Sequence, residues 1–244
     1  MNNTAIIIPS RLDAKRLPEK PLKLINGKEM ILHVYDLARA SGVGDVLVVT
    51  PDEVIEKLIK KNGGKSFLSK NQHQTGTDRV YEAFKDFYFK KPKNIINLQG
   101  DMPILNPKSI VELKEYLEKN LCDIATLASS LKNKDEINDQ NIVKVITGDN
   151  IEKSGFSEAL DFKRDSINYN DKFIYHHIGI YGFTSKALIR YVNLKRSKLE
   201  INRNLEQMRA MENKMKIKVG YTASNPLSID TEEDLNKVKK LMEK

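Results

Sequence analysis

The chain of 244 residues is long enough to bury a full hydrophobic core, and its 40% hydrophobic and 30% charged residues are ordinary for a globular protein. It has no run of about 18 apolar residues, which excludes a membrane-spanning helix, and its single cysteine excludes an internal disulfide framework. The formal net charge of +8 favours anionic partners, but the lysines are spread along the chain without a basic tail, which argues against a nucleic-acid ligand. Residues 1–4 lack the features of a signal peptide, so we expect a cytoplasmic protein.

The first buried strand is predicted at residues 6–8, which are three isoleucines, and a positively charged loop follows it. The cations of this loop are Arg11, Lys15, Arg16 and Lys20. An open α/β sheet places its ligand at the carboxyl ends of its strands, and cations there indicate an anionic ligand such as a polyphosphate. A solvated basic loop is the alternative. The order of the parts, a strand and then cations between prolines, favours the anion site.

The same loop carries a family resemblance. Ser10-Arg11, Arg16-Leu17-Pro18 and Lys20-Pro21-Leu22 resemble the P-[AS]-R-x4-R-L-P-x-K-P-L segment of sugar-acid cytidylyltransferases, in particular the 3-deoxy-manno-octulosonate (KDO) cytidylyltransferase, or CMP-KDO synthetase, family. The resemblance continues to residue 235. It implies that this loop binds CTP through Ser10, Arg11, Arg16 and Lys20, with Arg11 and Lys20 also catalytic.

Helices and strands alternate at short spacing through the first half of the chain. An amphipathic helix is predicted at residues 29–41, a buried strand at 46–49 and a short strand at 67–68. Such alternation predicts a parallel sheet. With the resemblance, the expected fold is α/β, with a Rossmann-like, open and mostly parallel sheet flanked by helices, of the nucleotide-diphospho-sugar transferase type, and a small excursion subdomain.

The segment His73-Gln-Thr-Gly-Thr-Asp-Arg79 precedes a helix predicted from about Thr77 to Phe87. The free N–H groups of a helix start can bind an acceptor, although an ordinary capped turn is the alternative. The segment resembles the family motif H-x-[ST]-G-T-[DE]-R, which is similar to a cytosine-recognition loop. The resemblance implies CTP-binding roles for His73, Gly76, Thr77 and Arg79.

A strand predicted at residues 94–98 runs into Gln99-Gly-Asp-Met-Pro103. A carboxylate at the end of a central strand indicates a Mg²⁺ ligand, because magnesium prefers one or two carboxylates plus substrate phosphates. A turn built on aspartate is the alternative. The family motif Q-G-D-x-P matches here and implies that Asp101 is a catalytic metal ligand and that Gln99 contacts the sugar acid. Met102 replaces the family's usual acidic residue.

The middle of the chain contains strands predicted at residues 123–128 and 143–146, after a helix at 107–117. Residues 148–173 are the least regular part and are expected to leave the main sheet. No linker separates independent domains, so we expect one nucleotidyltransferase domain over residues 1–244, with 148–183 as a sugar-acid-binding or dimerisation excursion. The resemblance suggests a homodimer.

Residues 176–183, His-His-Ile-Gly-Ile-Tyr-Gly-Phe, form a predicted strand. Adjacent histidines point to opposite faces of a strand, so a joint metal site is not expected, and a structural histidine is the alternative for each. The stretch resembles the family signature [RK]-H-x-G-I-Y-G-[YF]. The resemblance implies that His177 and Tyr181 contact the sugar acid.

A helix is predicted over residues 199–212, with Ile201, Leu205 and Met208 facing the core. It resembles the family segment L-E-x5-L-E-Q-[LM]-R. The neighbouring face carries Glu200, Arg203 and Gln207, which the resemblance implies are sugar-acid contacts. The alternative is a simple ion pair between Glu200 and Arg203 along the helix.

The segment Ser228-Ile-Asp-Thr-Glu-Glu-Asp-Leu235 predicts a turn into a helix capped by Thr231 and Asp234. The cap does not explain Asp230. The family motif [VI]-D-T-x-E-D-L matches, and it implies that Asp230 is the second catalytic metal ligand.

Together, these motifs imply an enzyme of lipopolysaccharide biosynthesis that joins CTP and KDO to give CMP-KDO and pyrophosphate, with Mg²⁺ as cofactor. Glu158 stands where the family has a cation, Arg203 stands where glutamate is common, and Arg164 resembles a family arginine in a segment about one residue shorter. Glu158 and Arg164 are therefore further candidates for the sugar-acid site. The two charge reversals leave open a compensating swap, surface drift, or a modified acid such as 8-amino-KDO. A nonulosonic acid is a separate alternative, and the resemblance of the His-x-Gly-Ile-Tyr-Gly stretch to the KDO branch argues against it.

Overall fold

The computed structural model describes residues 3–14, 16–119, 122–132, 134–164 and 172–243, which form two compact units. Unit 1 comprises residues 1–111 and 226–244, and unit 2 comprises residues 112–225. Helix α4 (Pro107–Lys119) crosses the boundary in the sequence. Both units contain helices and strands, so the predicted α/β class is confirmed. Every helix in the described part of the chain is too short or too polar to cross a membrane.

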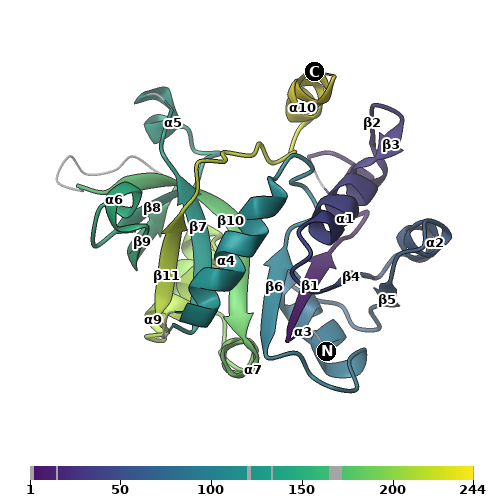
Figure 1. Ribbon diagram of the computed structural model, residues 1–244, viewed down its shortest axis with the longest axis horizontal. Helices are drawn as coiled ribbons and strands as arrows, with labels where there is room; N and C mark the ends of the chain where they lie inside the picture. Colours follow the sequence, from purple (N-terminus) through teal and green to yellow (C-terminus); the bar gives the residue numbers. More distant parts are fainter. Residues whose placement is uncertain (1–2, 15, 120–121, 133, 165–171, 244) are drawn as a thin grey trace. The chain divides into compact units, whose positions relative to one another are not determined.

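Unit 1 contains four parallel strands in the order β5-β4-β1-β6, with helices beside them (Figure 1). Ile7 of β1 lies opposite Leu47 of β4 and Asn97 of β6. All of β1 is buried, which explains its continuous apolar run. The elements of unit 1 are β1 (Thr4–Pro9), the 3₁₀ helix η1 (Lys20–Leu22), β2 (Leu24–Ile25), β3 (Lys28–Glu29), α1 (Met30–Ala40), β4 (Asp45–Thr50), α2 (Glu53–Lys61), β5 (Ser66–Leu68), α3 (Gly76–Asp86), β6 (Asn94–Leu98) and α10 (Glu232–Met242).

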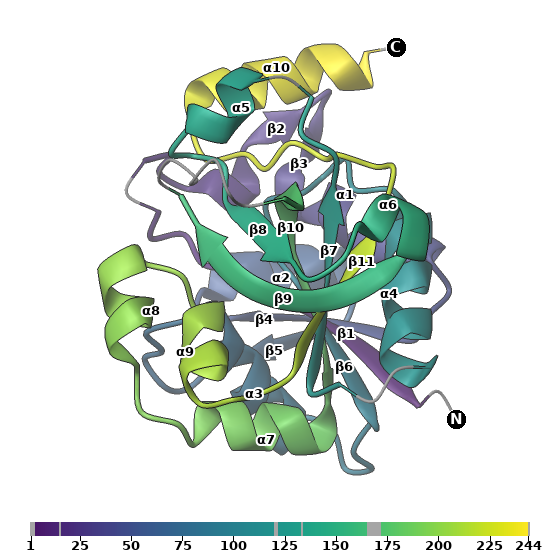
Figure 2. The ribbon, with the colours of Figure 1, turned by 90° about the vertical axis from the view of Figure 1, so that its left-hand side faces the viewer.

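The short hairpin β2–β3 follows the cationic loop in the sequence and packs against α10. Its turn residues Asn26 and Gly27 have φ angles of 49° and 83°, a conformation that asparagine and glycine adopt most readily. Figures 1 and 2 both show α10 beside this hairpin. A buried apolar cluster joins the two segments, and it consists of Leu17, Ile25, Met30, Ile229, Leu235 and Val238. The cluster therefore holds the later part of the cationic loop and the segment that follows it against the C-terminal helix.

Unit 2 contains five strands that close into a ring in the order β10-β7-β11-β9-β8, with β8 also pairing with β10. Strands β7 and β11 are parallel, whereas the other pairings in the described residues are antiparallel. Figure 2 shows β9 as a long curved strand in this unit. Its elements are β7 (Ile124–Ser129), α5 (Lys134–Asn138), β8 (Lys144–Thr147), α6 (Ile151–Ser154), β9 (Phe156–Lys163), β10 (Ile174–Thr184), α7 (Ser185–Val192), α8 (Lys198–Arg203), α9 (Gln207–Glu212) and β11 (Ile217–Tyr221).

The strand pairing is therefore mixed. The parallel arrangement predicted for the sheet is present in unit 1, where helices separate consecutive strands. In unit 2, only the short helix α6 separates β8 from β9 in the sequence, and a close connection of this kind favours antiparallel neighbours.

Two local predictions in unit 2 were wrong. The segment expected to be irregular, 148–173, contains α6 and the eight-residue strand β9, while residues 165–171 of it lie outside the described part of the chain. The helix predicted at residues 199–212 is broken by Asn204, whose φ of 52° ends α8 in a left-handed conformation. The break turns Ile201 to solvent, 57% exposed, while Leu205 and Met208 are buried.

Candidate active site

The loop after β1 is fixed by hydrogen bonds at its first residues. The N–H of Ser10 donates to the carbonyl of Val49 (3.0 Å), which extends the pairing of β1 with β4. The N–H of Leu12 donates to Asp52 Oδ2 (2.8 Å). Ser10 Oγ is buried and has no hydrogen-bond partner among the described residues. A buried hydroxyl in this condition fits a ligand atom as its partner. Lys15, the remaining cation predicted in this loop, lies outside the described residues.

Two cations and two carboxylates meet in unit 1. Lys20 Nζ lies 2.8 Å from Asp101 Oδ2 and 3.2 Å from Asp230 Oδ1. Arg16 Nη2 lies 2.9 Å from Asp230 Oδ2. The side chain of Lys20 is 16% exposed and that of Asp101 24%, whereas Arg16 is 57% exposed. The Lys20 contacts are therefore shielded from water, and the Arg16 contact lies at the open side of the cluster.

This meeting follows from the packing of three separate segments. Lys20 begins η1, Asp101 follows β6, and Asp230 precedes α10. The N–H of Ile229 donates to the carbonyl of Asp101 (2.9 Å), and the side chain of Ile229 belongs to the same apolar cluster as Leu17. These contacts place both aspartates beside the lysine.

The electrostatics of the cluster keep Lys20 charged. Burial disfavours the ammonium form, but the charges and hydrogen bonds of Asp101 and Asp230 together outweigh it, so the pKa of Lys20 is raised above its ordinary value. Lys20 is thus a permanent cation near neutral pH.

The carboxylates of Asp101 and Asp230 also fit a divalent metal ion. Both are within hydrogen-bond distance of one atom, Lys20 Nζ, so they converge on a shared position. No group of three His, Cys, Asp or Glu side chains suited to a metal occurs in the described ranges, so further ligands would be substrate or water oxygens. Two carboxylates completed by phosphate and water is a donor set that Mg²⁺ prefers.

Helix α3 starts one residue earlier than predicted, at Gly76, and its cap is Thr75. Thr75 Oγ1 accepts a hydrogen bond from the N–H of Asp78 (3.2 Å). A Cβ atom at Gly76 would lie 3.4 Å from Pro9 Cγ and 3.5 Å from Gln99 Oε1. The N-terminus of α3 therefore lies close to the ends of β1 and β6.

A buried polar chain connects α3 to β6. Asn97 Nδ2 donates to Thr77 Oγ1 (3.1 Å), and Gln99 Nε2 donates to Asn97 Oδ1 (2.9 Å). Asn97 is fully buried. Because a buried amide is costly without partners, this chain fixes Thr77 and Gln99 relative to each other.

The loop before α3 is held by Glu82. Its Oε1 accepts hydrogen bonds from the N–H of Lys70 (2.9 Å) and from Asn71 Nδ2 (3.0 Å), and its Oε2 pairs with His73 Nε2. Burial alone would raise the pKa of Glu82, but the bonds from His73 and Lys70 outweigh it and lower the pKa below its usual range. An ionised Glu82 therefore fastens His73 and its loop to α3.

Unit 1 also contains a buried cation on α3, Arg79, which is 6% exposed. Its pKa is lowered, first by burial and then by the positive charge of Arg11, while Asp52 and Glu82 partly offset both effects. Arg79 Nε has no hydrogen-bond partner within the described part of the chain. Two neighbouring guanidinium groups, one with an unused buried donor, fit an anion bound between them.

In unit 2, a bulge in β10 shapes the surroundings of His177. The pairing of β10 with β7 shifts register between Ile178 and Tyr181. Thr126 of β7 lies at the shift, where its Oγ1 is 2.9 Å from His177 Nε2 and 2.8 Å from the carbonyl of Ile180. Burial, followed by the charges of His176 and Arg164, lowers the pKa of His177 to about 3. His177 is therefore neutral at physiological pH.

His177, Tyr181 and Arg164 lie in one region of unit 2. The rings of His177 and Tyr181 have centroids 5.5 Å apart, and Phe162 packs edge-on against His177 at 4.9 Å. The charge of Arg164 acts on the pKa values of both His177 and Tyr181. Arg164 Nη1 donates to the carbonyls of Gln140 (3.2 Å) and Asn141 (3.0 Å).

Glu158 and Arg203, the two residues whose charge is opposite to that usual in the family, do not pair with each other. Arg203 pairs with Asp161 and donates to the carbonyl of Phe162 (2.9 Å). Glu158 is exposed on β9, opposite Lys218 in the register with β11. Each reversal therefore has its own charged neighbour, so a direct compensating swap does not explain them.

Glu200 is 1% exposed and pairs with Arg209 and Arg196, not with Arg203. The break at Asn204 allows Arg209 of α9 to return to Glu200 of α8. Gln207 is buried, and its Nε2 has no hydrogen-bond partner in the ranges that the structure describes. The simple helical ion pair between Glu200 and Arg203 is therefore wrong.

Sequence reasoning missed several residues that support the site. A polar signal existed for Asn97, which interrupts the apolar strand 94–98, and for Thr75, which stands three residues before Asp78. Asp52 and Thr126 gave no such signal, because their partners are 40 and 51 residues away in the chain. Glu82 gave none because its partners lie in the loop before α3, beyond the reach of any helical spacing.

Comparison with known proteins identifies the family. The cytidylyltransferase family model matches residues 5–217. Curated 3-deoxy-manno-octulosonate cytidylyltransferases from Bartonella henselae and Bartonella tribocorum are 40% and 39% identical over 238 residues, covering 97% of this chain and 97% of each relative. The chain belongs to the 3-deoxy-manno-octulosonate cytidylyltransferase family. The member from Brucella ovis is 37% identical, with 97% and 94% of the two chains covered.

Solved structures agree with this family. The structure of CMP:2-keto-3-deoxy-manno-octonic acid synthetase complexed with CTP matches with a TM-score of 0.88 at 33% identity and covers 98% of both chains. The structure of 4-diphosphocytidyl-2C-methyl-D-erythritol synthase from Anaerococcus prevotii shares the fold, with a TM-score of 0.65 at 14% identity over 99% of this chain and 98% of that one. The resemblance predicted from the motifs of the 3-deoxy-manno-octulosonate cytidylyltransferase family is therefore confirmed.

Proposed function

We propose that this chain joins CTP and KDO to give CMP-KDO and pyrophosphate, the activation of a sugar acid for lipopolysaccharide biosynthesis. The observation that carries the proposal is the cluster of Lys20 and Arg16 with Asp101 and Asp230. It provides two carboxylates for a metal and two cations for phosphates within unit 1, in a chain of this family.

The reaction is an in-line displacement at the α-phosphorus of CTP. The anomeric hydroxyl oxygen of KDO forms a bond to that phosphorus as the bond to the β-phosphate oxygen breaks. The hydroxyl proton passes to solvent, and pyrophosphate leaves. Arg11, Arg16 and Lys20 stabilise the charge that develops on the departing pyrophosphate.

Asp101 and Asp230 would hold Mg²⁺. The metal supplies neutralisation of triphosphate charge and orientation of the attacking oxygen. In the proposal, CTP is bound by Ser10, Arg11, Arg16 and Lys20 from the loop after β1 and by His73, Gly76, Thr77 and Arg79 around the start of α3. The unused donor groups of Ser10 and Arg79 support this assignment.

The family motifs assign contacts with the sugar acid to a set of residues in unit 2, and the Q-G-D-x-P motif of unit 1 separately assigns one to Gln99. Neutral His177, the neighbouring Tyr181 and the unused amide of Gln207 support the assignment, because each can bond a sugar hydroxyl or carboxylate. The remaining members are Glu158, Arg164, Glu200 and Arg203. The buried pairing of Glu200 with Arg209 favours support of the site rather than direct contact for this residue.

We further propose that the two units act as one nucleotidyltransferase domain with a Rossmann-like sheet of the nucleotide-diphospho-sugar transferase type. Residues 148–183, which include β9 and β10, would contribute to sugar-acid binding and dimerisation. A cytoplasmic homodimer is the expected form of the protein.

The test is pyrophosphate release with CTP, Mg²⁺ and a panel of acids consisting of KDO, 8-amino-KDO and N-acetylneuraminate. We expect release with KDO. Release with N-acetylneuraminate alone, or with no acid in the panel, would contradict the proposal.

A second candidate substrate, 8-amino-KDO, is favoured by the exposed carboxylate of Glu158. If Glu158 pairs with the amino group, Glu158→Gln lowers kcat/KM for 8-amino-KDO by about tenfold and leaves the value for KDO unchanged. The matched control is Glu152→Gln, which removes a carboxylate on α6 in the same unit. Equal effects of Glu158→Gln on both acids would remove the case for this substrate.

Replacing Glu82 tests the nucleotide loop. Glu82→Gln removes one of the two acceptor oxygens that hold Lys70, Asn71 and His73, so we expect KM for CTP to rise about tenfold while kcat changes little. Steady-state pyrophosphate release measures both constants. Glu53→Gln, on the exposed side of α2, is the control and should change neither. An unchanged KM for CTP in Glu82→Gln would show that the loop does not bind the nucleotide.

A further inference from the structure

The position of Lys20 places a protein cation between the two carboxylates that suit a metal. Its ammonium group donates to both Asp101 Oδ2 (2.8 Å) and Asp230 Oδ1 (3.2 Å), and it is largely shielded from solvent. Asp230 has a second cation, Arg16, but that side chain is 57% exposed and its charge is screened by water. Lys20 is therefore the main counter-charge of the pair.

We propose that Lys20 is a built-in competitor for the metal, whose ammonium group must leave Asp101 and Asp230 before a divalent cation can bind them. This inference rests on the proposed function. A divalent ion and an ammonium group cannot both lie between the two carboxylates, because they would repel each other at short range. Binding of the metal alone is therefore opposed by the loss of two charge-assisted hydrogen bonds.

The triphosphate of CTP removes this penalty. A bound triphosphate offers Lys20 a new anionic partner, so the lysine exchanges carboxylate for phosphate contacts as the metal takes its place. The metal and the nucleotide then favour each other's binding, and by linkage the effect is the same in both directions. The site would therefore have a low affinity for a divalent ion alone and a higher affinity for the same ion in the presence of the nucleotide.

The test uses Mn²⁺ without any nucleotide, with binding measured from the electron paramagnetic resonance signal of the free ion. We expect Lys20→Met to bind Mn²⁺ about tenfold or more tightly than the parent chain, because a positive charge next to the site is removed. Lys20→Gln, which keeps a hydrogen-bond donor without the charge, should show the same direction. Lys57→Met, which removes an exposed lysine on α2 in the same unit, should bind as the parent chain does.

Thermal unfolding gives an independent measurement. Without Mn²⁺, Lys20→Met leaves two carboxylates facing each other and should unfold at a lower temperature than the parent chain. Added Mn²⁺ should raise the midpoint of Lys20→Met more than that of the parent, because the ion binds the folded state. Adding Asp101→Asn to Lys20→Met should abolish this gain.

Equal or weaker Mn²⁺ binding by both Lys20 variants would overturn the proposal. Failure of the proposed function is a separate result. If the parent chain releases no pyrophosphate with any acid while the Lys20 variants gain Mn²⁺ affinity, the competition at the carboxylates stands and the assigned reaction does not.

Discussion

The substitutions Asp101→Asn and Asp230→Asn should each lower kcat for pyrophosphate release by about 10²–10⁴-fold, because each removes one of the two carboxylates proposed to hold Mg²⁺. Asparagine has nearly the same size as aspartate, and the backbone bond from Ile229 to the carbonyl of Asp101 does not depend on either side chain. The loss should therefore be in turnover rather than in folding. Steady-state assays with CTP and KDO measure it, with circular dichroism to compare the folds.

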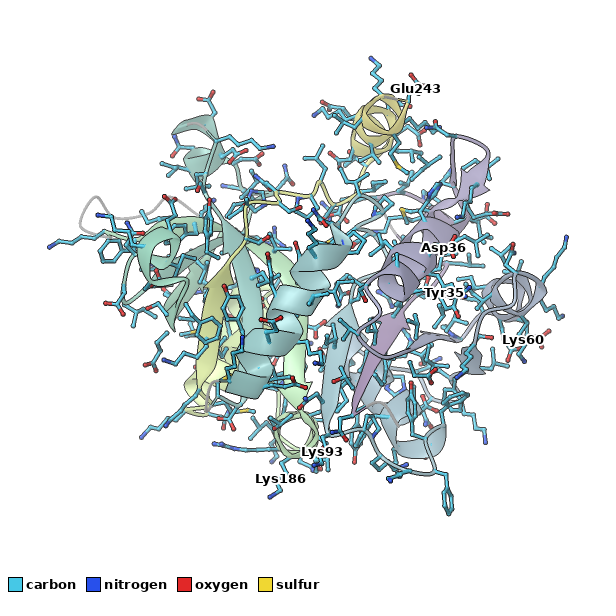
Figure 3. All side chains as sticks on the ribbon, in the orientation of Figure 1. Tyr35, Asp36, Lys60, Lys93, Lys186 and Glu243 are labelled. Carbon is cyan, nitrogen blue, oxygen red and sulfur yellow. The ribbon has the colours of Figure 1, made fainter. Side chains whose placement is uncertain are left out.

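The matched control is Asp36→Asn on α1 (Figure 3), which breaks an exposed ion pair with Lys28 in the same unit. It should retain full activity. Near-normal turnover in both Asp101→Asn and Asp230→Asn would contradict the metal-assisted mechanism, whatever the control does.

Arg209→Met should lower the free energy of unfolding by about 3–5 kcal/mol, because it leaves the buried carboxylate of Glu200 without its main partner. Arg209 Nε and Nη2 lie 2.9 Å and 2.7 Å from the two carboxylate oxygens of Glu200, and both side chains are at most 2% exposed. The guanidinium also lies over the ring of Tyr191, 4.6 Å from its centroid. Urea unfolding of the two chains measures the difference.

The exposed pairs of α2 provide the control for this experiment. Lys60 projects outward from α2 (Figure 3) and pairs with Glu56, so Lys60→Met should change the free energy of unfolding by at most about 0.5 kcal/mol. An effect of Arg209→Met as small as that of Lys60→Met would show that the buried pair adds little stability.

Glu200 also predicts an acid dependence. Burial alone would raise its pKa, but the bonds from Arg209 and Arg196 outweigh it and lower the pKa below the value in the unfolded chain. Its stabilisation is therefore present above the unfolded-state pKa and is lost as the pH falls through the lower folded-state pKa. Glu200→Gln should remove this part of the acid dependence of unfolding.

The first half of the fold could be predicted because its signals are local. The isoleucines at residues 6–8 form a buried strand, and the helix of residues 29–41 has one apolar face, as found in β1 and α1. Unit 2 was harder to predict. Strand β11 has lysine at position 218 and glycine at 220, and its pairing with β7 joins residues about 90 positions apart. The break at Asn204 depends on the return of Arg209 to Glu200, which no helical periodicity reveals.

In the candidate site, too, local features could be predicted from the sequence and long-range contacts could not. Each motif could be recognised where it stands, so Lys20, Asp101 and Asp230 were all selected. Their convergence could not be obtained from spacing, because Lys20 is 81 residues from Asp101 and 210 from Asp230 in the chain. The physical cause is the apolar cluster containing Leu17 and Ile229, which is a property of the folded unit.

The division of unit 1 into residues 1–111 and 226–244 has a consequence for the order in which the site forms during synthesis. The ribosome makes the cationic loop and Asp101 early, but Asp230 and the apolar residues of α10 emerge only after all of unit 2. A nascent chain therefore carries the lysine and the first carboxylate without the second. The site is completed only after unit 2 has been synthesised, so a chain interrupted before Asp230 lacks the proposed metal pair.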